Sequence, residues 1–276
     1  MAQRPSSSYR ELAPPVALAP YVARLWVHEL GIGDLVYQQP VLPDGCIDVV
    51  SVGDRSPLLA GPATGPATLE LVPGTVTVGV RFRTGAAPAL VGASAAEVRD
   101  QDVPLDELWG RSGALLTERT AETTTATERL RTLVDALVTR LGDAGTIDPV
   151  GTGIARLMHD RPGRSLHQLA TEVGLSDRQL RRRVEAAVGY PPRMLARVLR
   201  FQRFLHAARS SVRGRDLAGL AAEIGYADQA HLTRESRELA GLPPAALLDW
   251  EAQRLGEPSH RDGRIVQDLV GAAVGP

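Results

Sequence analysis

LHQLATEVGLSD (residues 166–177) recurs 51 residues later as LAGLAAEIGYAD (residues 217–228), with identical residues at six positions. Each copy has apolar residues at the spacing of a short amphipathic helix. A glycine then follows, Gly174 or Gly225, where the chain can turn with a positive φ before a second helix. This order is typical of a helix-turn-helix. One copy would be a weak signal, but two copies with the same internal spacing strongly indicate a duplicated unit.

The second helix of each copy has exposed side chains that suit the reading of DNA bases. In the first copy Ser176 is the expected N-cap, and Leu180 and Val184 share the buried face. Arginine can bind guanine, and glutamine can bind adenine, through paired hydrogen bonds. The alternative is that these side chains are ordinary solvated groups. The residues that we predict to contact DNA are Arg178, Gln179, Arg181, Arg182, Gln229, His231, Thr233 and Arg234.

A long helix is predicted between the two copies, over residues 191–209, because the Pro191-Pro192 pair suits a helix start. A helix of about 20 residues spans roughly 30 Å, which is close to the roughly 34 Å of one DNA turn. Such a connector could direct both second helices at neighbouring segments of the major groove. Its arginines Arg193, Arg197 and Arg200 share one face, where they either contact phosphate or are solvated.

Charge is distributed unevenly along the 276 residues, although the net charge is only −1. Residues 152–250 contain 16 arginines against 10 acidic residues, a net of +6, whereas residues 1–151 contain 12 against 18, a net of −6. A basic half joined to an acidic half indicates a module that binds a polyanion, attached to a second domain. All 31 basic residues are arginine, which we attribute to codon bias in a GC-rich genome.

The N-terminal half predicts an α+β domain with a small sheet. Residues 22–83 are rich in strand signals, with candidate strands at 47–52, 67–72 and 75–82. Apolar residues then recur with helical spacing from Leu130 to Leu141, after a capping box formed by Thr125 and Glu128. This apolar stripe either packs onto its own domain or forms a dimerisation helix. Trp26 and Trp109 are expected to pack in the core rather than to line a ligand pocket.

Four segments follow from these patterns. Residues 1–141 are predicted to form an α+β domain, residues 142–153 a linker, residues 154–250 an all-α domain of two helix-turn-helix units joined by a long helix, and residues 251–276 a flexible tail.

Several classes of site are excluded by residues that the chain lacks. Cys46 is the single cysteine, so no intramolecular disulfide can form, and we expect a buried structural thiol and a cytoplasmic protein. No apolar run reaches the roughly 18 residues that a membrane span needs. The six histidines are scattered, which predicts no metal and no cofactor. No phosphate-binding glycine loop or serine-nucleophile motif occurs, so no enzymatic activity is expected.

Residues 154–248 resemble the DNA-binding domain of AraC/XylS-type transcriptional regulators. The resemblance implies two DNA-reading helices. This sequence departs from the family at aromatic core positions, where it has Val184, Leu232 and Ser236. The departure predicts looser packing of the second unit. The N-terminal half resembles, more loosely, an uncharacterised sensor-like domain of some members, which implies effector binding or subunit pairing. The matching segments are 174–182, 189–192, 200–203, 224–234 and 240–244, and, in the N-terminal half, 42–48, 78–82 and 103–110.

The sequence therefore predicts a sequence-specific DNA-binding transcription regulator that reads successive major-groove segments with two recognition helices. Its expected partner is double-stranded DNA, together with a small-molecule effector, a second copy of the chain and, for an activator, RNA polymerase. One alternative is a small-molecule-binding or enzymatic N-terminal domain with secondary DNA binding. Another is a protein-interaction scaffold built from helical hairpins.

Overall fold

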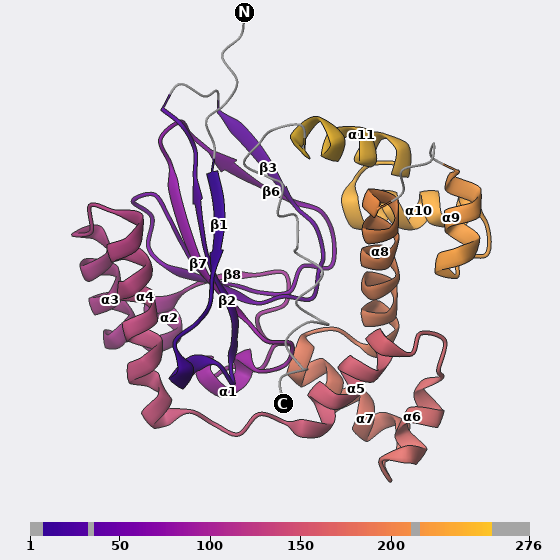
Figure 1. Ribbon diagram of the computed structural model, residues 1–276. Helices are drawn as coiled ribbons and strands as arrows, with labels where there is room; N and C mark the ends of the chain where they lie inside the picture. The colour runs from indigo at the N-terminus through magenta and orange to yellow at the C-terminus, as the bar shows by residue number, and fades with distance from the viewer. Residues whose placement is uncertain (1–7, 33–35, 211–215, 256–276) are drawn as a thin grey trace, which may run out of the picture.

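The computed structural model describes residues 8–32, 36–210 and 216–255. A sheet-rich N-terminal half lies beside a helical C-terminal half, in which the long helix α8 (Pro192–Ser210) stands between two groups of shorter helices (Figure 1). The predicted fold class is therefore confirmed.

Two antiparallel sheets form the N-terminal half. The larger has the strand order β1-β2-β7-β4-β5-β8, and β3 pairs with β6 in a separate two-stranded sheet. Side chains alternate along β7 as predicted, because Val78, Val80 and Phe82 are buried on one face. The strands are β1 Ser8–Leu12, β2 Val22–Glu29, β3 Tyr37–Val41, β4 Asp48–Val52, β5 Leu58–Ala60, β6 Ala67–Leu71, β7 Val76–Phe82 and β8 Asp102–Pro104.

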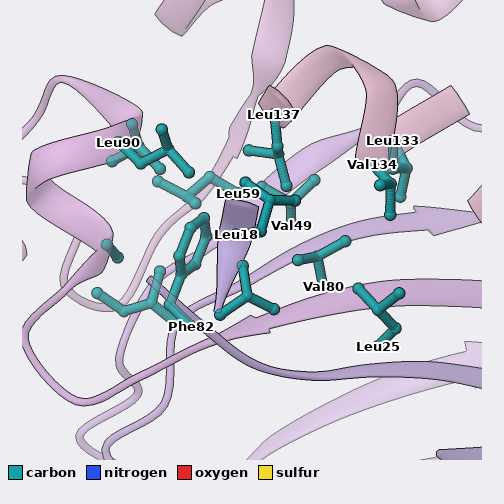
Figure 2. Close-up of a cluster of buried hydrophobic side chains, with 14 of the residues drawn as sticks. Leu18, Leu25, Val49, Leu59, Val80, Phe82, Leu90, Leu133, Val134 and Leu137 are labelled. Carbon is teal, nitrogen blue, oxygen red and sulfur yellow. The ribbon is translucent and has the colours of Figure 1, made fainter. Parts of the chain in front are cut away.

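Helix α4 (Ala126–Arg140) covers one face of the larger sheet and closes the main core. Figure 2 shows Leu133 and Leu137 of this helix beside the strand residue Val80. The predicted capping box is present, since Thr125 Oγ1 accepts from the Glu128 N–H and the Glu128 carboxylate accepts from the Thr125 N–H, both at 3.2 Å. The apolar stripe thus packs onto its own domain, which removes the reason to assign α4 to dimerisation.

The opposite face of the sheet packs against the β3–β6 pair. Trp26 lies over Gly79, where a Cβ atom would be 2.2 Å from the indole ring, so glycine is required for the close approach. Trp109 donates its indole N–H to the Val91 carbonyl at 3.0 Å and stacks under Arg140. Both tryptophans therefore pack within the domain. Short helices complete this half, namely η1 Val16–Leu18, α1 Ala87–Val91, α2 Leu105–Trp109, α3 Arg111–Ala121 and η2 Leu141–Asp143.

Two pairs of short helices occupy the two ends of α8 in the C-terminal half. Helices α6 and α7 lie near its start, and α9 and α10 lie along its far end (Figure 1). This arrangement matches the two predicted helix-turn-helix units. The helices other than α8 are α5 Pro149–Asp160, α6 Leu166–Glu172, α7 Asp177–Val188, α9 Leu217–Ile224, α10 Gln229–Ala240 and α11 Pro244–Leu255.

Two segment boundaries differ from the pattern of the sequence. Helix α5 begins at Pro149, inside the predicted linker 142–153, after Asp148 caps it by accepting from the Val150 N–H at 3.0 Å. Gly151 looks like a helix breaker, but it lets α5 approach α7, because a Cβ atom there would lie 2.8 Å from the Cβ of Ala187. At the other end, α11 continues to Leu255, into the predicted tail 251–276, and residues 256–276 lie outside the described residues.

Candidate nucleic-acid interface

The first unit presents three arginines on one face of α7. Its turn contains Gly174 with φ of 66°, and Leu180 is fully buried below the helix. Arg178, Arg181 and Arg182 are exposed, as predicted. Since residues three and four apart share one side of a helix, these three arginines lie on the same side of α7.

Gln179 is exposed, and its side chain takes part in the cap of α7. Its Oε1 accepts from both the N–H and the hydroxyl of Ser176 at 2.9 Å, and its own N–H donates to Ser176 Oγ at 3.3 Å. A paired contact to adenine requires the amide oxygen as well as the amide nitrogen. Gln179 therefore fixes the start of α7 in this conformation, and its contact with DNA stays a prediction.

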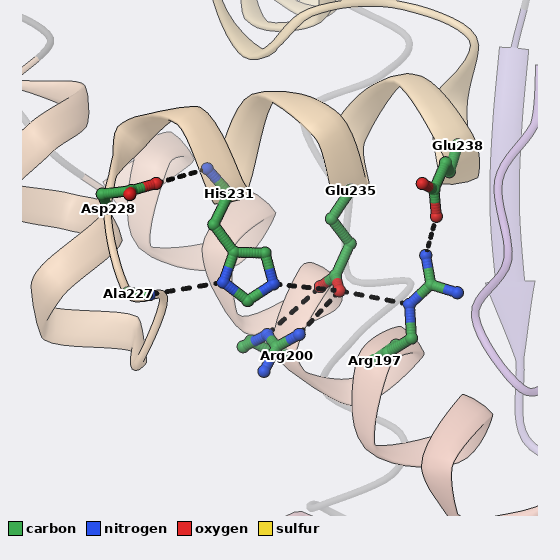
Figure 3. Close-up of polar contacts among 7 residues, drawn as sticks. All are labelled: Arg197, Arg200, Ala227, Asp228, His231, Glu235 and Glu238. Carbon is green, nitrogen blue, oxygen red and sulfur yellow. Dashed lines mark hydrogen bonds and ion pairs between the residues drawn. The ribbon is translucent and has the colours of Figure 1, made fainter.

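The second unit is built differently on the surface of α10. Asp228 caps the helix by accepting from the His231 N–H at 2.6 Å (Figure 3). The ring of His231 turns inwards, where its Nδ1 accepts from the Ala227 N–H at 3.3 Å. Its centroid lies 5.2 Å from the centroid of the Tyr226 ring, and the two rings are nearly perpendicular. The Thr233 hydroxyl donates to the Gln229 carbonyl at 2.9 Å. Of the residues predicted here, Gln229 and Arg234 are the exposed ones.

The two recognition helices are offset by 52 residues rather than 51. Gly174 lies two residues before the N-cap of α7, whereas Gly225 lies three residues before the N-cap of α10. From that point Leu232 takes the place of Leu180, and Gly241 takes the place of Gly189. Asp177 and Asp228 are therefore identical in the sequence repeat but do not occupy equivalent positions in the two units. Arg178, Arg181 and Arg182 correspond to Ala230, Thr233 and Arg234, so the first unit carries more positive charge.

Arg237 is a further surface arginine that was not predicted from the sequence. It is exposed on α10, three residues after Arg234 and four after Thr233, and thus extends the same helix face. The helical spacing in the sequence could have identified it.

A buried carboxylate joins α10 to α8. Glu235 is 3% exposed and accepts from Arg200 Nη2 at 2.6 Å and from Arg197 Nε at 3.2 Å (Figure 3). Arg197 also pairs with Glu238, and the Arg200 guanidinium lies 4.7 Å from the centre of the Tyr226 ring. Arg197 and Arg200 are therefore not simply solvated, because they pair with carboxylates of α10. Phosphate contact by this arginine face stays a prediction.

Helix α10 of the second unit is held in place although the aromatic core residues of the family are absent. Ser236 is fully buried, and its hydroxyl donates to the Leu242 carbonyl at 2.7 Å, which ties α10 to the turn that follows it. Leu232 is also fully buried. The hydrogen bond and the Glu235 ion pairs hold the helix where the resemblance predicted looser packing.

The N-terminal half contacts α7 near its C-terminal end. Arg99 Nη1 donates to Glu185 and to the Gly189 carbonyl, both at 2.9 Å. The three exposed arginines lie in the first turns of the helix, so these contacts leave them accessible.

Cys46 is half-buried, rather than fully buried as predicted, in a polar cluster of the N-terminal half. Arg81 pairs with Asp48 at 2.8 Å and with Asp44 at 3.5 Å, and the Cys46 N–H donates to Asp44 Oδ1 at 2.8 Å. Burial raises the pKa of the Cys46 thiol well above its ordinary value, and the two carboxylates add to this effect against the opposing charge of Arg81. The thiol is therefore held in its protonated, unreactive form.

This cluster predicts slow alkylation of Cys46. Because a raised pKa keeps the thiol protonated as the pH rises, we expect iodoacetamide to modify the native protein at pH 8 at least about tenfold more slowly than the urea-unfolded chain. Mass spectrometry over time measures both rates. Equal rates in the two states would contradict the assignment.

Within the described ranges, no cluster of three or more His, Cys, Asp or Glu side chains could hold a metal ion. None of the described helices combines the length and the apolar composition that crossing a bilayer requires.

Comparison with known families and structures identifies both halves. Residues 169–249 match a helix-turn-helix domain family, and residues 10–104 match a domain of unknown function, DUF6597. No curated protein matches the sequence. Solved structures of ToxT from Vibrio cholerae are similar at 10% identity. One, from strain O395, has a TM-score of 0.41 and covers 89% of this chain and 97% of that chain.

Another ToxT structure from the same strain, bound to (E)-4-(8-methylnaphthalen-1-yl)but-3-enoic acid, has a TM-score of 0.40 and 10% identity, and covers 90% of this chain and 99% of that chain. One family match lies in each of the two halves of the fold. The C-terminal half of the chain thus contains a helix-turn-helix domain, residues 169–249, and the N-terminal half contains a DUF6597 domain, residues 10–104.

Proposed function

We propose that the protein is a sequence-specific DNA-binding transcription regulator that reads two successive major-groove segments with α7 and α10. The observation that carries the proposal is the exposed face of Arg178, Arg181 and Arg182 on the capped helix α7 of a duplicated helix-turn-helix. Arginine supplies both phosphate contacts and paired contacts to guanine. Residues Gln229, Thr233, Arg234 and Arg237 supply the corresponding surface of α10.

The two units contribute unequally in this proposal. The face of α7 has three arginines, whereas the equivalent positions of α10 are Ala230, Thr233 and Arg234. We therefore assign most of the electrostatic affinity to the first unit. The second unit contributes mainly to the choice of sequence and to the length of the site.

Salt titration tests the proposal. If three phosphates are neutralised, log K falls with a slope of about −2.7 against log salt, so affinity drops about 40-fold between 50 and 200 mM salt. The measurement uses the full chain and a duplex selected from a random-sequence pool, with fluorescence anisotropy as the readout. A salt-independent affinity, or failure to select any duplex, would contradict DNA binding as the function.

The remaining parts of the proposal concern the N-terminal domain, residues 1–141. We assign it the binding of a small effector, and a groove of about 350 Å³ between the β4–β5 and β6–β7 turns offers a place for one. Arg129 is 8% exposed at this groove and donates to the Gly53 carbonyl and, at 3.1 Å, to Thr123 Oγ1. The proposal also includes a homodimer, contact with RNA polymerase if the protein is an activator, and a cytoplasmic location, and it gives the protein no catalytic role.

A further inference from the structure

One loop of the N-terminal half contacts the C-terminal ends of both recognition helices. This is the 61–66 loop, Gly61-Pro62-Ala63-Thr64-Gly65-Pro66. Pro62 packs on Gly189, the C-cap of α7, where a Cβ atom would lie 2.3 Å from the Pro62 Cγ. Pro66 packs on Gly241, the C-cap of α10, where a Cβ atom would lie 3.6 Å from the Pro66 Cγ. Equivalent points of the two units therefore lie against the two prolines of one short loop.

Further contacts join the loop to the DNA-binding half. The hydroxyl of Tyr190, a fully buried residue, donates to the Ala63 carbonyl at 2.6 Å. Gly65 lies against α10, because the Glu238 carbonyl oxygen is 3.8 Å from the position that a Cβ atom would take at Gly65. The contacts thus alternate along the loop, with Pro62 and Ala63 at the first unit and Gly65 and Pro66 at the second.

The loop is itself fixed to its own domain by a residue with a strained backbone. Asp100 is the one non-glycine residue with a positive φ in the described part of the chain, at 57°. Its carboxylate accepts from the Thr64 N–H at 2.6 Å and from the Thr64 hydroxyl at 2.8 Å, and its N–H donates to the Pro62 carbonyl at 3.2 Å. A left-handed backbone at a residue other than glycine is an energetic cost, and here it orients three hydrogen bonds that hold the loop.

We propose that the 61–66 loop sets the relative orientation of α7 and α10, and so determines the spacing of the two DNA segments that the protein can read. Helix α8 is one connection between the units, and it joins α7 through the short turn 189–191. The loop is a second connection, from the end of α7 to the end of α10. With both connections in place, one unit rotates less freely relative to the other than it would if α8 alone joined them. The proposal rests on the proposed function, because it concerns how two DNA-reading helices are positioned.

The loop also gives the N-terminal domain a route to control DNA binding. Four residues of extended chain span at most about 14 Å, so a small displacement of Asp100 or of the 61–66 loop changes both contact points together. The same domain holds the α7 end through Arg99, next in sequence to Asp100. A change at residues 99–100 would therefore reach both recognition helices.

The first test measures orientation without DNA. Spin labels are attached in the full chain at Glu172→Cys on α6 and Glu223→Cys on α9, in a Cys46→Ala background, because both glutamates are exposed. Asp100→Gly removes the carboxylate while accepting the positive φ, whereas the control Asp100→Asn keeps an acceptor and tolerates the same backbone. We expect a distance distribution at least about twice as broad in Asp100→Gly, and an unchanged one in Asp100→Asn.

A second variant tests the same proposal whether or not Asp100→Gly folds. Insertion of Gly-Ser-Gly between Thr64 and Gly65 separates the two prolines while keeping every contact residue, and lengthening a surface loop costs little stability. The same three residues inserted between Ala13 and Pro14, in the loop that follows β1 and outside the effector groove, serve as the matched control. Unchanged label distances in the 64–65 insertion variant, with native circular dichroism, would overturn the proposal.

The DNA arm of the test uses the selected duplex with five base pairs inserted between its two segments, about half a helical turn. We expect the parent protein to lose at least about 30-fold in affinity, and the 64–65 insertion variant to lose less than about fivefold. An equal loss in both proteins would contradict control of spacing by the loop. Failure of the parent to bind any duplex would instead contradict the proposed function, and the label distances would still decide whether the loop orients the helices.

Discussion

Replacement of Arg178, Arg181 and Arg182 together by alanine is expected to weaken binding to the selected duplex at least 100-fold. Each arginine that contacts a base or phosphate contributes roughly 1–3 kcal/mol, and a loss of about 3 kcal/mol corresponds to more than 100-fold in the dissociation constant. The three side chains are exposed and are not needed for the buried face of α7. Stability should therefore change by less than about 0.5 kcal/mol. Anisotropy titration and thermal unfolding measure the two effects.

Arg183→Ala is the matched control on the same helix. Its Nη1 points back to the N-cap of α5 and lies 3.2 Å from the Asp148 carboxylate. We expect the duplex affinity of this variant to change less than about threefold. An effect as large as that of the triple variant would mean that general positive charge, rather than the predicted face, determines binding.

Glu235→Ala is expected to destabilise the second unit by about 2–3 kcal/mol. Removal of one partner from a buried ion pair leaves the other charges unsatisfied, at a cost of roughly 3–5 kcal/mol. We reduce this figure because the side chains of Arg197 and Arg200 are 36% and 23% exposed. Hydrogen exchange along α10 is the measurement, since the loss should be concentrated where this helix meets α8.

Glu238→Ala provides the comparison for the buried carboxylate. Glu238 pairs with the same Arg197 but is 62% exposed, and an exposed ion pair contributes about 1 kcal/mol or less. Exchange in this variant should be close to that of the parent. If both variants exchanged equally fast, burial of Glu235 would not be the source of its contribution.

The duplicated unit was predictable because its signals are local. Spacing of apolar residues, the Ser176 cap and the turn glycines each depend on neighbours within one or two helical turns, and the structure contains all three. The same holds for the Thr125–Glu128 capping box and the alternation along β7. Patterns of this kind are decided by backbone geometry and by which face is buried.

Other features depend on contacts between distant segments, which spacing in the sequence does not encode. The one-residue shift between the units appears only when Leu232 and Gly241 are seen in the places of Leu180 and Gly189. His231 suits base reading by its chemistry, yet its ring is held inwards by Ala227 and Tyr226. Strands β1 and β8 are short, lie at the sheet edges and carry polar residues, so they lack a strand pattern.

The 61–66 loop could not have been identified from the sequence at all. Its Gly-Pro pairs look like ordinary loop punctuation, and their partners Gly189 and Gly241 lie more than 100 residues away in the chain. Tertiary packing alone gives these glycines and prolines their common role.

Methylation protection of guanine N7 on the selected duplex is the most direct measurement of two-helix reading. The account predicts two protected patches in the major groove, about 10 base pairs apart. The triple arginine variant, assayed at a concentration that restores occupancy, should lose one patch and keep the other. A single patch, or none under conditions of full binding, would contradict the claim that both recognition helices read DNA.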